Sequence, residues 1–251
     1  MAKTKKTKKK IVKKKAPKKV PSRLSTGIKK LDSLIQGGYK NYSINLIEGG
    51  PGSGKTILAT SFLMEGLKKK ESCMYITFEL NKNKYYQDMK TIGWDLESYE
   101  KKGIFTFLSY TPEQIKNVLV EGGGTLDTTI TKKKVKRLVI DSITSFALLY
   151  PSELAKKEAA LSLFNMINDW QCTTVLTAQG DEDKEHGNPV FSAALDFEVE
   201  GIMLLYHPLK SGSRKRGLEI LKMRGTKHPN KVFEIDITSK GIIMKSSILK
   251  N

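Results

Sequence analysis

The chain of 251 residues contains only two cysteines, Cys73 and Cys172, and they are not in a CxxC spacing. It has no uninterrupted apolar run of the roughly 18 residues that a membrane-spanning helix needs, and its first residues lack the apolar segment of a secretory signal. Its three histidines, His186, His207 and His228, show no metal-ligand spacing. These absences argue against a disulfide-stapled, membrane-inserted or histidine-metal protein, and they predict a reducing, cytoplasmic compartment.

Acidic residues are missing from the first 23 positions, which hold eleven lysines and Arg23 and so carry +12 of the formal net charge of +18. Residues 24–251 hold 32 basic and 26 acidic residues, a net charge of +6. A lysine-rich segment repels itself and cannot bury a core, so we expect a disordered tail over 1–23 and one folded domain over 24–251. Such a tail either attracts nucleic acid or another acidic partner by counterion release, or serves only solubility.

The order of apolar patterns predicts an α/β fold. Five apolar segments alternate with helical patterns, at residues 43–48, 74–78, 104–108, 137–141 and 173–178. Four further strand-like segments follow without helices between them, at 202–206, 218–223, 232–237 and 242–244. This order is typical of a mostly parallel sheet flanked by helices, with an antiparallel C-terminal extension. Glycines 122–124 and the polar residues after them predict a flexible loop, and 180–194 a long polar loop.

One motif carries most of the functional information. The segment Gly49-Gly50-Pro51-Gly52-Ser53-Gly54-Lys55-Thr56 matches GxxxxGK[ST] in full, after a predicted strand and before a predicted helix. Backbone N–H groups of such a loop surround phosphate oxygens, and the following helix directs its positive end at them. Lys55 is then expected to reach the β- and γ-phosphates, and the Thr56 hydroxyl to bind Mg²⁺. The sequence therefore predicts a P-loop nucleotide site.

Two carboxylates end predicted strands downstream of the P-loop. Asp141 closes an apolar strand, where a carboxylate can hold the Mg²⁺ hydration shell; alternatively it caps the helix that follows. Glu79 closes the strand at 74–78 and can orient and deprotonate a water, or it is an ordinary surface residue at a strand end. Because strand ends line the ligand-binding edge of an open α/β sheet, both carboxylates are candidates for that edge.

Several short segments together resemble a KaiC-type domain of the RecA superfamily, from about Ser25 to Lys245. Besides the P-loop, they are Ser25-Thr26-Gly27-Ile28-Lys29-Lys30-Leu31-Asp32, Gly37-Gly38, Tyr75-Ile76-Thr77-Phe78-Glu79, Gly93-Trp94-Asp95-Leu96 and Leu221-Lys222-Met223-Arg224-Gly225-Thr226. The resemblance implies a RecA-like core, ATP as the nucleotide, and Glu79 as the catalytic glutamate.

The resemblance also implies that the active sites are shared between subunits. Lys222 and Arg224, two apart on a predicted strand, correspond to a Lys-x-Arg pair that reaches the γ-phosphate of the neighbouring subunit in KaiC-like proteins. A homo-oligomeric ring, a hexamer by analogy, is then expected, and Gln179 is a candidate γ-phosphate sensor. His228 belongs to the stretch at residues 224–228 of the family resemblance, without an expected catalytic role.

The sequence departs from the clock proteins of this family in three respects. Clock-type domains often show two consecutive glutamates where this chain has Glu79-Leu80, and the clock protein has two tandem domains where this chain has room for one. The phosphorylated Ser-Thr pair corresponds here to Asp196-Phe197, so clock-style autophosphorylation is not expected at that place.

Three functions remain open at this level. The first is an ATP-hydrolysing ring whose nucleotide state controls assembly or partner binding. The second is a RecA/RadA-like ATPase acting on DNA, which the four acidic residues within 181–185 and the absence of a helix-hairpin-helix module disfavour. The third is a nucleotide-binding scaffold with little turnover, which Glu79 disfavours.

Overall fold

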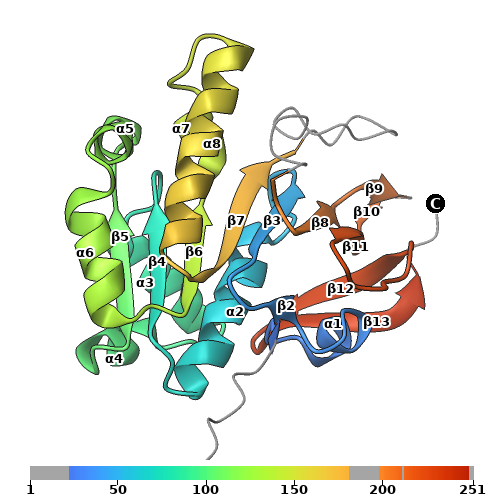
Figure 1. Cartoon of the computed structure of the whole chain (residues 1–251). Coiled ribbons are helices and arrows are strands. Elements are labelled where there is room, and N and C mark those ends of the chain that lie inside the picture. The colour runs from blue at the N-terminus through green and yellow to red at the C-terminus, as the bar shows by residue number, and fades with distance from the viewer. Residues whose placement is uncertain (1–22, 181–197, 211, 249–251) are drawn as a thin grey trace, which may run out of the picture.

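The computed structural model describes residues 23–180, 198–210 and 212–248 (Figure 1). Its helices are α1 (Lys29–Leu34), α2 (Lys55–Lys68), α3 (Lys82–Thr91), α4 (Leu96–Lys101), α5 (Pro112–Val120), α6 (Gly124–Lys133), α7 (Ile143–Ala147) and α8 (Glu153–Asp169). Its strands are β1 (Arg23–Leu24), β2 (Tyr39–Lys40), β3 (Ile44–Gly49), β4 (Cys73–Thr77), β5 (Phe105–Ser109), β6 (Arg137–Asp141), β7 (Thr173–Gln179), β8 (Gly201–Tyr206), β9 (Leu209–Lys210), β10 (Ser213–Arg214), β11 (Arg216–Met223), β12 (Val232–Thr238) and β13 (Gly241–Ile248).

A nine-stranded sheet organises the described residues, in the order β13-β12-β11-β8-β3-β7-β6-β4-β5. Six neighbouring strands of this sheet are parallel, namely β8, β3, β7, β6, β4 and β5. The strands β11, β12 and β13 continue the sheet in antiparallel pairs. This confirms the predicted parallel sheet with an antiparallel extension. The P-loop strand β3 lies between β7 and β8, and every residue in it is buried.

Two hydrophobic cores lie on opposite faces of the sheet. One packs α1, α2, α3 and α4 with the C-terminal strands, and the other packs α5, α6, α7 and α8. Within β6 the alternation is direct, since Val139 belongs to the first core while Leu138 and Ile140 belong to the second. Because successive strand residues face opposite sides, a strand covered on both faces is apolar throughout. The apolar runs in the sequence correspond to the central strands of the sheet, which helices cover on both faces.

The segment after Gly122 differs from the sequence-based expectation of a flexible loop. It forms α6, with Gly123 as the residue that precedes the helix. Leu126 and Ile130, four residues apart, are buried in the second core, and the Trp170 indole donates to Asp127 at 3.1 Å. The prediction of a loop was wrong because burial of two apolar side chains outweighed the weak local helix preference of a glycine- and threonine-rich segment. Most of the predicted 180–194 loop lies outside the described residues.

Arg23 belongs structurally to the folded domain, although its charge groups it with the tail. It lies in β1, and its guanidinium donates to the carbonyls of Ile35 (3.1 Å) and Gly38 (2.9 Å) and to the Thr226 hydroxyl (2.8 Å). Two of these bonds fasten the start of the described chain to the connection between α1 and β2, and the third fastens it to the segment that follows β11. Residues 1–22, the remainder of the predicted tail, lie outside the described residues.

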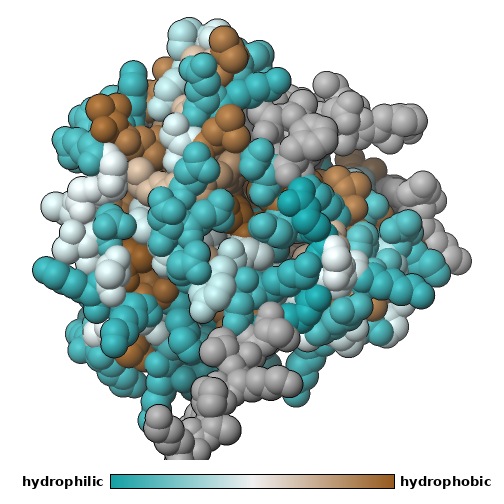
Figure 2. All heavy atoms as spheres, in the orientation of Figure 1, coloured by the Kyte–Doolittle hydropathy of each residue, from teal (hydrophilic) through white to brown (hydrophobic). Residues whose placement is uncertain are grey.

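The surface in Figure 2 is mostly hydrophilic, with apolar residues in separate small groups. The most exposed large apolar side chains include Val120 at the end of α5 and Leu148 after α7. None of the described helices combines the length and apolarity that crossing a membrane requires.

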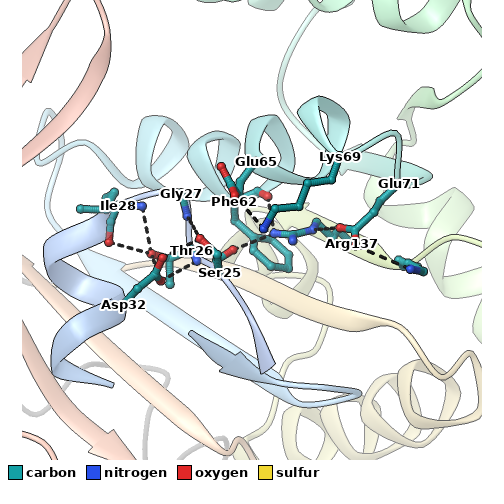
Figure 3. Close-up of polar contacts among 11 residues, drawn as sticks. Ser25, Thr26, Gly27, Ile28, Asp32, Phe62, Glu65, Lys69, Glu71 and Arg137 are labelled. Carbon is teal, nitrogen blue, oxygen red and sulfur yellow. Dashed lines mark hydrogen bonds and ion pairs between the residues drawn. The ribbon is translucent and has the colours of Figure 1, made fainter. Parts of the chain in front are cut away.

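A fully buried arginine joins three segments beneath the P-loop helix (Figure 3). Arg137 donates to the Glu71 carboxylate at 2.7 Å, to the Ser25 carbonyl at 2.7 Å and to the Phe62 carbonyl at 2.9 Å. Its guanidinium carbon also lies 4.6 Å from the centre of the Phe62 ring. A Cβ on Gly66 would lie 2.4 Å from the Arg137 side chain, which explains a glycine inside α2. Arg137 therefore connects β6, α2 and the N-terminal segment.

We expect Arg137→Ala to lower the free energy of unfolding by about 3–5 kcal/mol, because removal of one partner leaves buried polar groups without donors. The control is Lys136→Ala. Its ammonium lies 3.6 Å from the same Glu71 carboxylate but is 61% exposed, so its loss should cost less than about 1 kcal/mol. Urea unfolding of both variants measures the difference. Equal effects would show that the buried bonds of Arg137 contribute little.

Candidate functional site

The P-loop connects β3 to α2 through residues whose backbone tolerates few alternatives. Gly54 precedes α2 with a φ of 104°, in the left-handed region that favours glycine. A Cβ on Gly49 would lie 2.5 Å from the Leu205 carbonyl oxygen, so β8 can approach only a glycine there. The fully buried Ser53 hydroxyl donates to the Gly50 carbonyl at 2.8 Å, closing the loop on itself. The pattern in the sequence thus corresponds to a tightly folded strand-loop-helix unit, with Pro51 and Gly52 exposed at its tip.

Lys55, the first residue of α2, turns its side chain back over the loop. Its ammonium donates to the carbonyls of Gly49 (2.7 Å) and Gly50 (2.9 Å). A phosphate group placed in the loop would come within reach of the same ammonium. The geometry therefore agrees with the expected role of Lys55 as a cation for phosphate oxygens.

Asp141 lies at the carboxyl end of β6 and accepts hydrogen bonds from three hydroxyl groups. Thr56 in the first turn of α2 donates to Oδ2 at 2.8 Å, Tyr75 donates to Oδ2 at 2.5 Å, and Thr177 donates to Oδ1 at 2.5 Å. Burial and the nearby Asp141 carboxylate raise the pKa of Tyr75 well above its usual value, so the phenol keeps its proton. Asp141 is only 7% exposed, and these bonds satisfy its buried charge.

The pair of Thr56 and Asp141 fits Mg²⁺ by its chemistry. Mg²⁺ prefers oxygen ligands and is usually bound by one or two carboxylates with substrate phosphates and several waters. A hydroxyl and a carboxylate in contact at 2.8 Å, next to a phosphate-type loop, provide that donor set. The alternative interpretation, in which Asp141 caps α7, has no support in the described contacts, because the residue preceding that helix is Ser142 and it makes no side-chain capping bond.

Glu79 lies just beyond β4, beside Asp141. Thr77 and Asp141 are partners in the pairing of β4 with β6, which places Glu79 at the same sheet edge. Its side chain is exposed and accepts from the Ser142 hydroxyl at 3.3 Å and, more closely, from the Ser145 hydroxyl of α7. Two serines thus hold the predicted base, and sequence reasoning did not identify either of them in this role.

Gln179 ends β7 opposite the first glycine of the loop, since Gly49 and Gln179 are partners in the pairing of β3 with β7. Its backbone N–H donates to the Thr144 hydroxyl at 2.8 Å. The structure therefore brings the P-loop, Asp141, Glu79 and Gln179 to one edge of the sheet. Parallel strands place their carboxyl ends together, which is why four segments distant in sequence meet there.

Lys222 and Arg224 lie elsewhere. Lys222 pairs with Ile202, which pairs with Leu46, three residues before the P-loop begins at Gly49. The backbone of Lys222 is therefore displaced from Gly49 by about 10 Å along the strands and by about 10 Å across the sheet. Arg224 follows β11 rather than lying in it, and its carbonyl accepts from the Lys40 ammonium at 2.5 Å. The chain therefore does not place these two cations beside its own P-loop.

Another residue of β11 does contact the P-loop. The Arg216 guanidinium donates to the Gly52 carbonyl at 3.0 Å, and His207 lies close to Gly52, within 3.4 Å of where a Cβ would stand. Sequence reasoning identified neither Arg216 nor Tyr75 and Thr177 as part of the site. The sequence carries no distinct signal for Thr177, because β7 also contains Thr173, Thr174 and Gln179.

Comparison with known proteins identifies the family of this chain. The family model described as "ATPase: KaiC" matches residues 24–247. A UPF0273 protein of Pyrococcus horikoshii is 31% identical over 236 residues, which cover 88% of this chain and 93% of that protein. The circadian clock protein KaiC3 of Synechocystis is 28% identical, over 88% of this chain and 45% of that longer protein.

A solved structure shows the same fold. The crystal structure of a KaiC-like protein from Pyrococcus horikoshii matches with a TM-score of 0.77 and 30% sequence identity, and the match covers 89% of this chain and 98% of that one. The matched residues of the family model span nearly the whole described structure, including the P-loop, Glu79 and Asp141. This chain belongs to the KaiC family of ATPase domains.

Proposed function

We propose that this chain is a Mg²⁺-dependent ATPase that assembles into a homo-oligomeric ring, a hexamer by family resemblance, and whose nucleotide state controls assembly or partner binding. The observation that supports it best is the meeting of the P-loop, the Thr56–Asp141 pair and Glu79 at one sheet edge. A phosphate-binding loop alone would serve a scaffold, whereas a carboxylate beside it supplies a base for hydrolysis. The two cysteines, both buried and free, fit a reducing compartment such as the cytoplasm.

Each residue at this edge has a proposed role in hydrolysis. The backbone N–H groups of residues 49–56 and the Lys55 ammonium hold the β- and γ-phosphates of ATP. Thr56 and Asp141 hold Mg²⁺, which when bound neutralises charge on the phosphate oxygens. Glu79 orients the attacking water and accepts its proton, while Ser142 and Ser145 keep its carboxylate at the sheet edge. Gln179 is proposed to contact the γ-phosphate.

The proposal of shared sites rests on the family resemblance, and the position of Lys222 and Arg224 leaves room for it. Lys222 and Arg224 are displaced from their own P-loop, along β11 and across two strands. Arg23 and Lys40 fasten the segment that contains Arg224, through the Thr226 hydroxyl and the Arg224 carbonyl. A cation held at this distance can stabilise phosphoryl transfer in a neighbouring subunit, as a trans-acting arginine does. A heterologous interface repeated around a closed ring would give every site one such neighbour.

A steady-state ATPase assay with and without single-stranded DNA tests the proposal against its alternatives. Hydrolysis that needs Mg²⁺ and is insensitive to DNA supports the proposed function. Strong stimulation by DNA would instead favour a RecA/RadA-like role. Tight nucleotide binding without turnover, even under conditions where the protein is assembled, would favour a scaffold.

The lysine-rich segment has its own test. Deleting residues 1–22 removes eleven lysines but keeps Arg23 and its three bonds. We expect the rate of ATP hydrolysis to stay within about twofold of that of the full chain, while any affinity for single-stranded DNA falls. The slope of log K against log salt concentration should become less steep by roughly 0.7 for each phosphate contact that is lost.

The matched control for this deletion is Arg23→Ala in the full chain, which keeps the lysines and removes the structural contacts. Binding measured against salt concentration, together with the ATPase rate, separates charge from structure. Loss of hydrolysis on deletion of 1–22 would show that the segment does more than attract polyanions.

A further inference from the structure

The Asp141 carboxylate accepts hydrogen bonds from two hydroxyls of the neighbouring strands that the proposed mechanism does not use. Tyr75 in β4 and Thr177 in β7 belong to the strands on either side of β6. Val139 pairs with Tyr75 on one side and with Val175 on the other, and Asp141 and Thr177 each lie two residues further along. Because side chains two residues apart share a face, Tyr75, Asp141 and Thr177 all lie on the face that α2 covers. Both Tyr75 and Thr177 are fully buried.

The phenol of Tyr75 has little freedom to leave Asp141. Its ring stacks on Tyr85 with a centroid distance of 4.4 Å and on Phe107 at 5.7 Å. The Tyr85 hydroxyl is itself hydrogen-bonded to the Thr60 hydroxyl at 2.8 Å, one turn beyond Thr56 in α2. The hydrogen bond between Tyr85 and Thr60 therefore links the aromatic stack to the helix that begins at the P-loop.

The hydrogen bonds of the carboxylate restrict its orientation. A carboxylate has about four lone-pair positions, and the terminal torsion of aspartate is broad. Thr177 occupies a position on Oδ1 and Tyr75 one on Oδ2, while Thr56 meets Oδ2 from the P-loop side. With each oxygen bonded to a residue of a neighbouring strand, rotation of the carboxylate is restricted, and Oδ2 stays in contact with Thr56.

We propose that Tyr75, together with Thr177, is a positioning residue that orients Asp141 toward the metal and nucleotide site. This inference rests on the proposed function, because the metal that Asp141 serves is part of it. Partners that orient a metal-binding carboxylate typically change metal affinity by 10–100-fold when they are removed. A phenol that only satisfied a buried charge would affect stability and leave metal affinity unchanged.

The test compares Tyr75→Phe with Tyr85→Phe. Each variant removes one buried hydroxyl from the same aromatic stack, but only the Tyr75 hydroxyl contacts Asp141. The probe is Mn²⁺ binding to the ADP complex, followed by electron paramagnetic resonance, with ADP affinity in EDTA measured in parallel. We expect Tyr75→Phe to weaken Mn²⁺ binding about tenfold and to leave metal-free ADP affinity unchanged, and Tyr85→Phe to change neither.

Thr177 provides a second pair of variants in case Tyr75→Phe does not fold. Thr177→Val removes the hydroxyl at similar volume, and Thr177→Ser keeps it. We expect Mn²⁺ affinity to fall severalfold in Thr177→Val and to be retained in Thr177→Ser.

The outcomes separate this inference from the proposed function. A wild-type protein that binds no Mn²⁺–ADP would overturn the proposed function and the inference with it. Normal wild-type binding together with unaltered Mn²⁺ affinity in Tyr75→Phe and Thr177→Val would overturn the inference alone. Equal losses of Mn²⁺ affinity in Tyr75→Phe and Tyr85→Phe would also overturn it, because the stack rather than the hydroxyl would then be responsible.

Discussion

Replacement of Lys55 by alanine is expected to weaken nucleotide binding by about 10- to 150-fold, the effect of losing a charged hydrogen bond of about 1.5–3 kcal/mol. The ammonium lies over the P-loop, within 3 Å of the Gly49 and Gly50 carbonyls, and no other lysine lies in residues 44–67. Alanine leaves the helix intact because it is the residue most favourable to helices. The loss should therefore appear in affinity, with little change in folding.

Titration with a fluorescent ATP analogue at fixed Mg²⁺ measures this effect. Lys68→Ala is the matched control, since Lys68 is exposed in the last turn of the same helix, remote from the loop. Lys55→Arg keeps the charge but replaces a compact ammonium with a planar fork, and we expect it to restore only part of the affinity. Unchanged affinity in Lys55→Ala would disprove the P-loop assignment.

The second large effect concerns Glu79 and the cations proposed to act in trans. Glu79→Gln should keep ATP binding and lose about 10²–10⁴-fold in turnover, because an amide cannot accept the proton of the attacking water. The glutamine retains an oxygen that can accept from Ser142 and Ser145, so the local structure should persist. The double variant Lys222→Ala with Arg224→Ala should also bind ATP and lose turnover, because the neighbouring site then lacks its cations.

In the proposed shared site the two defects lie in different subunits, so the inactive variants should complement each other. In an equal mixture with random subunit exchange, about a quarter of the interfaces pair an intact Glu79 with intact cations. The ATPase rate should therefore rise to about a quarter of the wild-type rate at a one-to-one ratio and fall on either side of it.

A variant that carries all three substitutions is the control for this mixing experiment. Combined with either parent, it offers no interface that has both an intact base and intact cations. If exchange is confirmed independently and the two parents still show no recovery at any ratio, Lys222 and Arg224 do not act across the boundary. The shared-site mechanism would then have to be abandoned, whereas the P-loop site would remain.

Local sequence patterns predicted the parts of the fold that depend on interactions between residues close together in the chain. The strand before the P-loop, the glycines within it and the helix after it occur where the pattern places them, with β3 ending at Gly49 and α2 starting at Lys55. Helix α5 begins with a capping box between Thr111 and Gln114, three residues apart, and has Pro112 in its first turn. Each of these features depends on residues a few positions apart, and such short-range preferences can be read from the sequence.

Other features depended on residues far apart in the chain. The glycines at 122–124 predict a loop from the local sequence, but the segment forms a helix because Leu126 and Ile130 pack in the second core. Arg137 reads as the polar start of a strand, yet Ser25 and Phe62 are its acceptors, from 112 and 75 residues earlier in the chain. Lys222 and Arg224 read as a pair on one strand, whereas β11 ends between them, at Met223.

The same division holds for the candidate site. The sequence by itself determined the P-loop, the carboxylates Glu79 and Asp141, and the α/β order, because each is carried by a contiguous motif or a strand end. Only the tertiary structure decided that Tyr75 and Thr177 bond to Asp141, that Ser145 holds Glu79, and that Lys222 lies away from its own P-loop. The physical reason is that strand order and register set these distances. The neighbouring strands β4, β6, β7 and β3, which carry most of the site, are separated by long stretches of sequence, so their pairing is established only when the whole core packs.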